Sequence, residues 1–156
     1  MNISSNLKSI GTMRLMLLGL IGLGLLGTGV ELLLLEHFED YWQMIPLFVV
    51  GLCLIVLCWS ANAGSARSLR IFQASMLIMI ASGFLGLYLH YDANREFELE
   101  MYPSLRGSQL FWEAIRGATP ALVPGMMVEL GLLGLVYTYK HPAIPNDKNR
   151  SNNQEV

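Results

Sequence analysis

The segment PALVPGMMVELGLLGLVYTYKHP, residues 120–142, decides how the rest of the chain is interpreted. It is apolar over about 20 residues, the length that a helix needs to cross a bilayer, and it carries one acid, Glu129, near its middle. Three earlier segments, at about 13–35, 44–63 and 68–91, have similar length and character. The pattern predicts an all-α integral membrane protein whose four spans form a four-helix bundle.

The composition agrees with a membrane protein that forms one domain. The chain has 156 residues, of which 53% are hydrophobic and only 14% are charged. A soluble domain carries roughly 25% charged residues, so the missing charge indicates an apolar surrounding, the lipid bilayer. The net charge of −2 argues against a nucleic-acid partner, because phosphate binding needs a concentrated basic surface. We expect a single transmembrane domain over 1–142 and a disordered cytoplasmic tail over 143–156.

The long connection at 92–119 has two parts. Apolar Phe97, Leu99 and Met101 alternate with glutamates, which favours an extended segment. An amphipathic helix should follow, capped by Ser108 and ended by Gly117. This short helix suits the membrane interface, where its apolar face would lie flat on the bilayer. A helix that covers the ends of the bundle is the alternative.

Small residues in the first span predict where helices meet. Its glycines divide between two sides of a helix: Gly19, Gly22 and Gly29 lie on one side, and Gly24 and Gly27, with Thr28 and Glu31, lie on the other. Glycine lets helices approach closely in lipid, so this span should have neighbours on both sides. The third span carries one stripe of residues three or four apart, which should be a packing face: Ser75, Met79, Ser82, Gly86 and His90.

Basic residues predict the orientation of the spans. Seven lie on the side of the N-terminus: Lys8, Arg14, Arg67, Arg70, Lys140, Lys148 and Arg150. Three lie on the other side: Arg95, Arg106 and Arg116. Because basic residues concentrate on the cytoplasmic side, both termini should be cytoplasmic in a multi-pass protein of the inner or plasma membrane. The opposite side is acidic and would attract cations or a basic partner.

The two halves of the chain share a short pattern. A histidine, an aromatic residue and an acid follow the first span at 37–39 and close the third at 90–92. Prolines at 46 and 120 also begin spans two and four in similar contexts. A duplication would make a 2+2 arrangement of parallel repeats, and it would place His37 and His90 at similar depth on the acidic side.

Glu129 is the sharpest candidate for an intramembrane site. A carboxylate in the middle of a bilayer is expensive and marks a functional site by default. It shares a stripe with Ala121 and Gly125, so we expect it to face another helix or a small cavity. There it would be hydrogen-bonded to Ser75 or Ser82, or paired with a charge in a partner protein. Glu31 lies nearer the acidic boundary and is a weaker candidate.

A metal or haem site is a further hypothesis for the acidic side. Imidazole and carboxylate groups suit zinc, iron or manganese, and two histidines from different helices are also suitable axial ligands of a haem. The candidate ligands are His37, His90, Glu36, Asp40 and Asp92. Methionines, including Met76, Met79, Met126 and Met127, suit Cu(I), although filling the core is their commoner use.

Three functions follow from these features. The first is a non-enzymatic accessory or scaffold subunit of a membrane complex, or a self-associating bundle, because the chain is rich in packing stripes. The second is a small cation or proton transporter or channel that uses Glu129 and the acidic mouth. The third is a membrane enzyme or electron carrier at His37 and His90. We find no motif for nucleophilic catalysis, so an enzyme is the least favoured class and no cofactor is expected.

Overall fold

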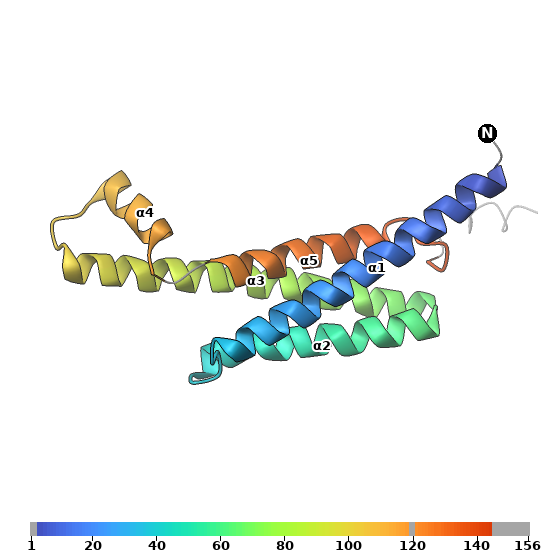
Figure 1. Ribbon diagram of the computed structural model, residues 1–156, viewed down its shortest axis with the longest axis horizontal. Coiled ribbons are helices and arrows are strands. Elements are labelled where there is room, and N and C mark those ends of the chain that lie inside the picture. Colours follow the sequence, from blue (N-terminus) through green and yellow to red (C-terminus); the bar gives the residue numbers. More distant parts are fainter. Residues whose placement is uncertain (1–2, 119–120, 145–156) are drawn as a thin grey trace, which may run out of the picture.

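The computed structural model describes residues 3–118 and 121–144, and all regular structure in these ranges is helical (Figure 1). The helices are α1 (Ile3–Leu34), α2 (Tyr41–Ala63), α3 (Ala66–Met101), α4 (Gly107–Arg116) and α5 (Leu122–Thr138). Helix α1 begins at Ile3, about ten residues before the predicted start of the first span. Most of the predicted tail, with Lys148 and Arg150, lies outside the described residues.

Three helices are long and apolar enough to cross a membrane. They comprise residues Lys8–Leu34 of α1 and the whole of α2 and α3. The fourth, α5, is equally apolar but has 17 residues, which is about 25 Å of helix. The chain is therefore a helical protein with three clear candidate spans and one shorter apolar helix.

Four helices pack in a cyclic order around one core. In the described residues, α1 contacts α2 and α5, and α3 contacts the same two helices. The core lies between them and includes Ile21, Leu25, Cys53, Phe72, Met76, Met79 and Met127. Many large side chains on the outer faces are exposed, as a lipid-facing surface requires.

Glycines of α1 lie against two neighbours, as predicted, but Gly19 and Gly27 do not take part, because a Cβ atom added at either would have nothing within 4 Å. A Cβ atom added at Gly29 would touch Val50 of α2, whereas one added at Gly24 would overlap with Leu130 of α5. The glycines of α5 that face α3 lie against backbone as well as side chains. A Cβ atom added at Gly131 would come within 2.9 Å of the backbone oxygen of Met76. Glycine therefore permits close helix approach on both covered sides of α5: Gly24 of α1 does so on one side, and Gly131 of α5 does so on the side that faces α3.

Helix α3 extends beyond the other helices, as Figure 1 shows at the end that carries α4. The predicted extended segment around 96–101 is wrong, because this segment is the last part of α3. The alternation of apolar residues with glutamates gave the wrong prediction, because the covered residues Tyr91, Asn94 and Glu98 follow helical spacing instead. Helix α4 covers this side, and Glu96, which lies between these positions, is exposed.

The predicted amphipathic helix is present as α4, with different caps and surroundings. Its N-cap is Arg106 rather than Ser108, and it ends at Gly117 as predicted. Ala114 is fully buried, and a Cβ atom added at Gly117 would overlap with Asn94 of α3. Helix α4 therefore packs on the extension of α3 and does not cover the ends of the bundle, which was the alternative prediction.

The two ends of the helix assembly have opposite character. One end contains the turn at 35–40, the last part of α3, and α4, and we call it the acidic end. The other is the basic end, where α1 begins, α2 turns into α3 and α5 finishes (Figure 1). At the basic end Arg14 donates hydrogen bonds to the backbone oxygens of Tyr137, Tyr139 and Lys140 at 3.2, 3.1 and 3.0 Å. A guanidinium at the last carbonyls of α5 also suits the negative end of the helix dipole.

Candidate ligand pocket and intramembrane carboxylate

A pocket of about 590 Å³ opens at the acidic end, where the turn between α1 and α2 faces α3 and the start of α5. Its walls are mostly apolar, with side chains such as Leu32, Leu85, Leu89 and Val123. The polar lining groups are Glu31, His37, Asp40, Gln43, Ser82 and His90. An apolar cavity of this size with a few convergent polar groups is the usual form of a small-ligand site.

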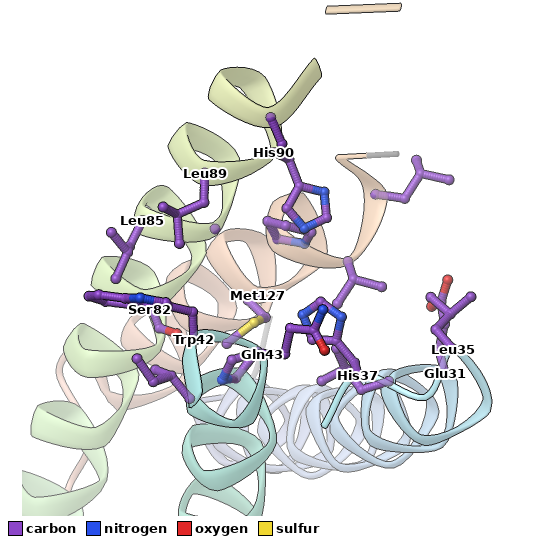
Figure 2. A pocket seen from close by; sticks show the side chains of 18 of the residues that line it. Glu31, Leu35, His37, Trp42, Gln43, Ser82, Leu85, Leu89, His90 and Met127 are labelled. Carbon is purple, nitrogen blue, oxygen red and sulfur yellow. The ribbon is translucent and has the colours of Figure 1, made fainter. Parts of the chain in front are cut away.

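Two histidines meet in this pocket. His37 lies in the turn that follows α1, and His90 lies within α3. Their ring centroids are 6.2 Å apart and the rings are tilted by 45°. Figure 2 shows both side chains directed into the pocket from opposite walls. The predicted proximity of the two residues is therefore present, although the duplication that suggested it stays a prediction.

Local structure places His37 at the rim. Helix α1 ends at Leu34, and the chain turns through Glu36, whose φ of 52° lies in the left-handed region. The Asp40 carboxylate then accepts a hydrogen bond of 2.6 Å from the Tyr41 amide and starts α2. The turn thus presents His37 to the side of the pocket and returns the chain into the next helix.

Burial sets the charge of His37 near neutral pH. Partial burial lowers the pKa of His37 below its ordinary value of 6.5, and the neighbouring His90 lowers it further. Both causes disfavour the imidazolium form. His37 is therefore a neutral imidazole at pH 7, the form that binds metals or accepts a proton.

The carboxylates predicted as metal ligands are arranged differently from the histidines. Asp40 lines the pocket but caps α2, and Asp92 forms an ion pair of 3.5 Å with Arg95. Glu36 is exposed in the turn. Within residues 3–118 and 121–144, no three His, Cys, Asp or Glu side chains form a group that could hold a metal. The predicted five-residue site thus reduces to the histidine pair and nearby acids.

The two serines of the α3 stripe have different environments. Ser75 is buried and donates a hydrogen bond of 2.8 Å to the Phe72 carbonyl. Ser82 lines the pocket, as does Glu31 from α1. Neither serine has a hydrogen bond to Glu129 in the structure. The packing stripe of α3 is therefore real, but it divides into a packed part and a part that faces the cavity.

Glu129 lies on the outer face of α5. The expectation that it faces another helix or a cavity is wrong for this chain, because its side chain is exposed and does not line the pocket. The covered residues of α5, such as Met127, Gly131 and Gly134, lie on the opposite side of the helix. Contacts with α3 and α1 set this rotation. Gly131 and Gly134 of α5 lie against α3, and Leu130 of α5 lies against Gly24 of α1, whereas the Ala121–Gly125 stripe is not used.

The exposed carboxylate is at the depth of the bundle centre. Its neighbour Leu130 packs on Gly24, which lies midway along the apolar run 15–35 of α1. Nothing lies within 4 Å of a Cβ atom added at Gly125, one turn away on the same face. Glu129 thus occupies the middle of an uncovered face with small residues beside it.

Trp42 and Gln43, near the start of α2, line the pocket but were not predicted as site residues. Met127 of α5 was considered only as a copper ligand or core residue, and its place in this pocket was not predicted. Met127 is four residues after Val123 on the covered side of α5, so its spacing indicated burial but not the cavity beside it. Gln43 is the one uncharged polar residue near the start of α2, which is a weak indication by itself.

Comparison with protein-family models, with curated proteins and with solved structures finds no match to this chain. The pocket and the exposed carboxylate are therefore the features of this protein that indicate a function.

Proposed function

We propose that this protein is a four-span, non-enzymatic subunit of a larger membrane complex, which binds a partner helix on the outer face of α5. The observation that carries the proposal is the exposure of Glu129 at mid-depth. An ionised carboxylate in hydrocarbon costs several kcal/mol by most measures. A partner that covers it with a cation removes that cost.

The α5 face, which comprises Ala121, Gly125, Glu129 and Leu132, fits such a partner. All but one of these residues are exposed, and Gly125 is partly covered. Small residues at four-residue spacing permit the close approach of a second backbone. The face combines a place for tight packing with one carboxylate for specificity.

Charge favours a different protein over a second copy. The apolar runs 15–35, 44–63, 71–91 and 122–138 contain no lysine or arginine. A second copy docked on this face would therefore bring two Glu129 side chains together, which is unfavourable while both are ionised. The fitting partner is a transmembrane helix with a lysine or arginine at mid-depth.

The topology belongs to the same proposal. Helix α5 completes the cyclic contacts among α1, α2 and α3, which supports its assignment in this proposal as the fourth span. Arginine and lysine residues concentrate at the basic end, and we assign that end, with both termini, to the cytoplasm of the inner or plasma membrane. Residues that flank a short span can reach the interfaces by local thinning of the bilayer.

Site-specific photocrosslinking tests the proposed face at native expression. A photoreactive residue replaces Leu132, which lies beside Glu129 on the outer face and is 52% exposed. The matched control is Leu77 on α3, which is 56% exposed and adjacent to Met76, the residue that contacts Gly131. We expect a heavier adduct from position 132 alone, and mass spectrometry should identify a membrane protein with a basic residue in its span.

A second variant tests the role of the carboxylate. Glu129→Gln should reduce the yield of this adduct at least fivefold, because it removes the charge that the partner's cation pairs with. The isolated protein should keep its elution volume in mild detergent, since the Glu129 side chain is exposed on the outer face of α5. Absence of an adduct, an adduct of two copies of this chain, or equal yields from both positions would each reject the proposal.

A further inference from the structure

Three side chains with donor atoms for soft metals line the pocket at the acidic end. Two are the imidazoles of His37 and His90, and the third is the thioether of Met127, which is 1% exposed. They come from the α1–α2 turn, α3 and α5, so the fold brings them together from three separate parts of the chain. Figure 2 shows the three side chains around the same cavity.

The spacing of the imidazoles suits a single metal ion between them. The ring centroids are 6.2 Å apart. With metal–nitrogen bonds of about 2.0 Å, two imidazoles on one ion have centroids roughly 5–6 Å apart, depending on the angle at the metal. The separation of the pair is therefore close to that of two imidazoles bound to one ion.

The surroundings favour a cation bound by neutral ligands. Glu31 and Asp40 line the same pocket and add negative charge at its rim. Opposite charges attract, so these carboxylates favour a cation in the pocket, whose imidazole and thioether ligands add no negative charge of their own.

The donor set selects among metals. Zinc usually takes four ligands, and within the described residues no third His, Cys, Asp or Glu is grouped with the pair closely enough to hold a metal ion. A thioether is a soft ligand that selects Cu(I), and Cu(I) is stable with two or three donors. We propose that His37, His90 and Met127 form a binding site for Cu(I) at the acidic end of this protein. This site is separate from the α5 face and does not depend on the proposed partner.

Competition with a chromophoric Cu(I) chelator tests the site in the full chain, purified in mild detergent under anaerobic reducing conditions. The background carries Cys58→Ser, because this exposed thiol would itself bind Cu(I). We expect one Cu(I) per chain. His37→Ala and His90→Ala should each weaken binding at least 100-fold, and Met127→Leu should weaken it about tenfold while Zn(II) binding stays weak.

The chain offers matched controls for both ligand types. His141 lies at the basic end beside Tyr137, and Met126 is the exposed neighbour of Met127. His141→Ala and Met126→Leu should leave Cu(I) affinity within twofold of the parent protein. A loss of affinity in these controls equal to that of the pocket variants would overturn the proposal.

X-ray absorption of the copper-loaded parent protein gives an answer without any pocket variant. Two nitrogen scatterers and one sulfur scatterer are expected around the copper. A spectrum without sulfur, or a parent protein that binds no Cu(I), or one that binds Zn(II) more tightly, would reject the assignment. Variants are compared only when their helical circular dichroism equals that of the parent.

Discussion

The basic and acidic ends of this protein use similar residues in different ways. At the basic end, Arg14 of α1 holds the end of α5, and Gln73 of α3 donates a hydrogen bond of 3.1 Å to Thr138. The ring of His141 lies beside that of Tyr137 there, with a tilt of 50° between them. At the acidic end, His37 and His90 face a cavity of about 590 Å³ instead. The difference indicates that one end fixes the helices while the other is available for a ligand.

The largest loss of stability is expected where α5 packs most closely on α3. Gly131→Val would push a side chain onto the backbone oxygen of Met76, 2.9 Å from the added Cβ atom, and backbone cannot move aside cheaply. We expect a loss of about 3 kcal/mol in the free energy of unfolding, measured by SDS titration of protein in mixed micelles.

The control for this prediction is Gly125→Val, where the added Cβ atom has open space. It should change the free energy of unfolding by less than about 0.5 kcal/mol. Equal losses for the two glycines would show that helix propensity rather than packing decides the outcome, and the contrast between the faces of α5 would no longer hold.

Two serines of α3 compare the packed part with the cavity directly. Ser75→Leu inserts volume beside buried Cys53 and removes a hydroxyl from a filled site, so it should cost about 2 kcal/mol. Ser82→Leu extends into the pocket and should be neutral or stabilise by about 0.5 kcal/mol. The same SDS titration measures both, and similar costs for the two would contradict a cavity at the acidic end.

The bond network at the basic end should contribute less than close packing. Arg14→Ala removes three hydrogen bonds to the end of α5, and we expect a loss of about 1–2 kcal/mol. Lys8→Ala, at an exposed position of the same helix, is the control and should have almost no effect. If Arg14→Ala were equally silent, the basic end would be held by apolar contacts alone.

The smallest effect is a pH dependence from the acidic end. The folded protein binds a proton at His37 less readily than the unfolded chain, because the pKa of His37 is lowered by burial and by His90. Stability from this residue is thus complete above pH 6.5 and falls as the pH drops toward the folded pKa. The charged groups facing it in the pocket are His90, Glu31 and Asp40.

His37→Ala should reduce the slope of unfolding free energy against pH between 5 and 7. Part of the slope should remain, because burial and Arg14 also lower the pKa of His141 at the basic end. An unchanged slope in His37→Ala would mean that the cavity does not disfavour the charged form of this histidine.

The predictable parts of this molecule are those set by local sequence. Apolar runs located α1, α2 and α3, and the spacing of Gly22, Gly24 and Gly29 indicated two neighbours for α1. The wrong predictions concern segments that are covered by a helix from another part of the sequence. The extension of α3 beyond residue 91 alternates like a strand, yet it is helical because α4 packs on it.

The candidate site was predictable only in part for a related reason. His37 and His90 follow a shared pattern at the ends of two spans, so their proximity could be expected. Met127 and Ser82 belong to the pocket because of how α5 and α3 are rotated, and Glu129 faces outward for the same cause. Helical periodicity defines the faces of a helix but does not say which face meets a neighbour when several are apolar.

The amino-acid sequence by itself determined the helices, their apolar surfaces and the separation of basic from acidic ends, because these follow from composition and from spacing along one helix. Only the tertiary structure decided which glycines are pressed against a neighbour, where the cavity lies and that Glu129 is uncovered. The physical reason is that α5 has small residues on both sides, and contacts with α1 and α3, far away in the chain, select one of them.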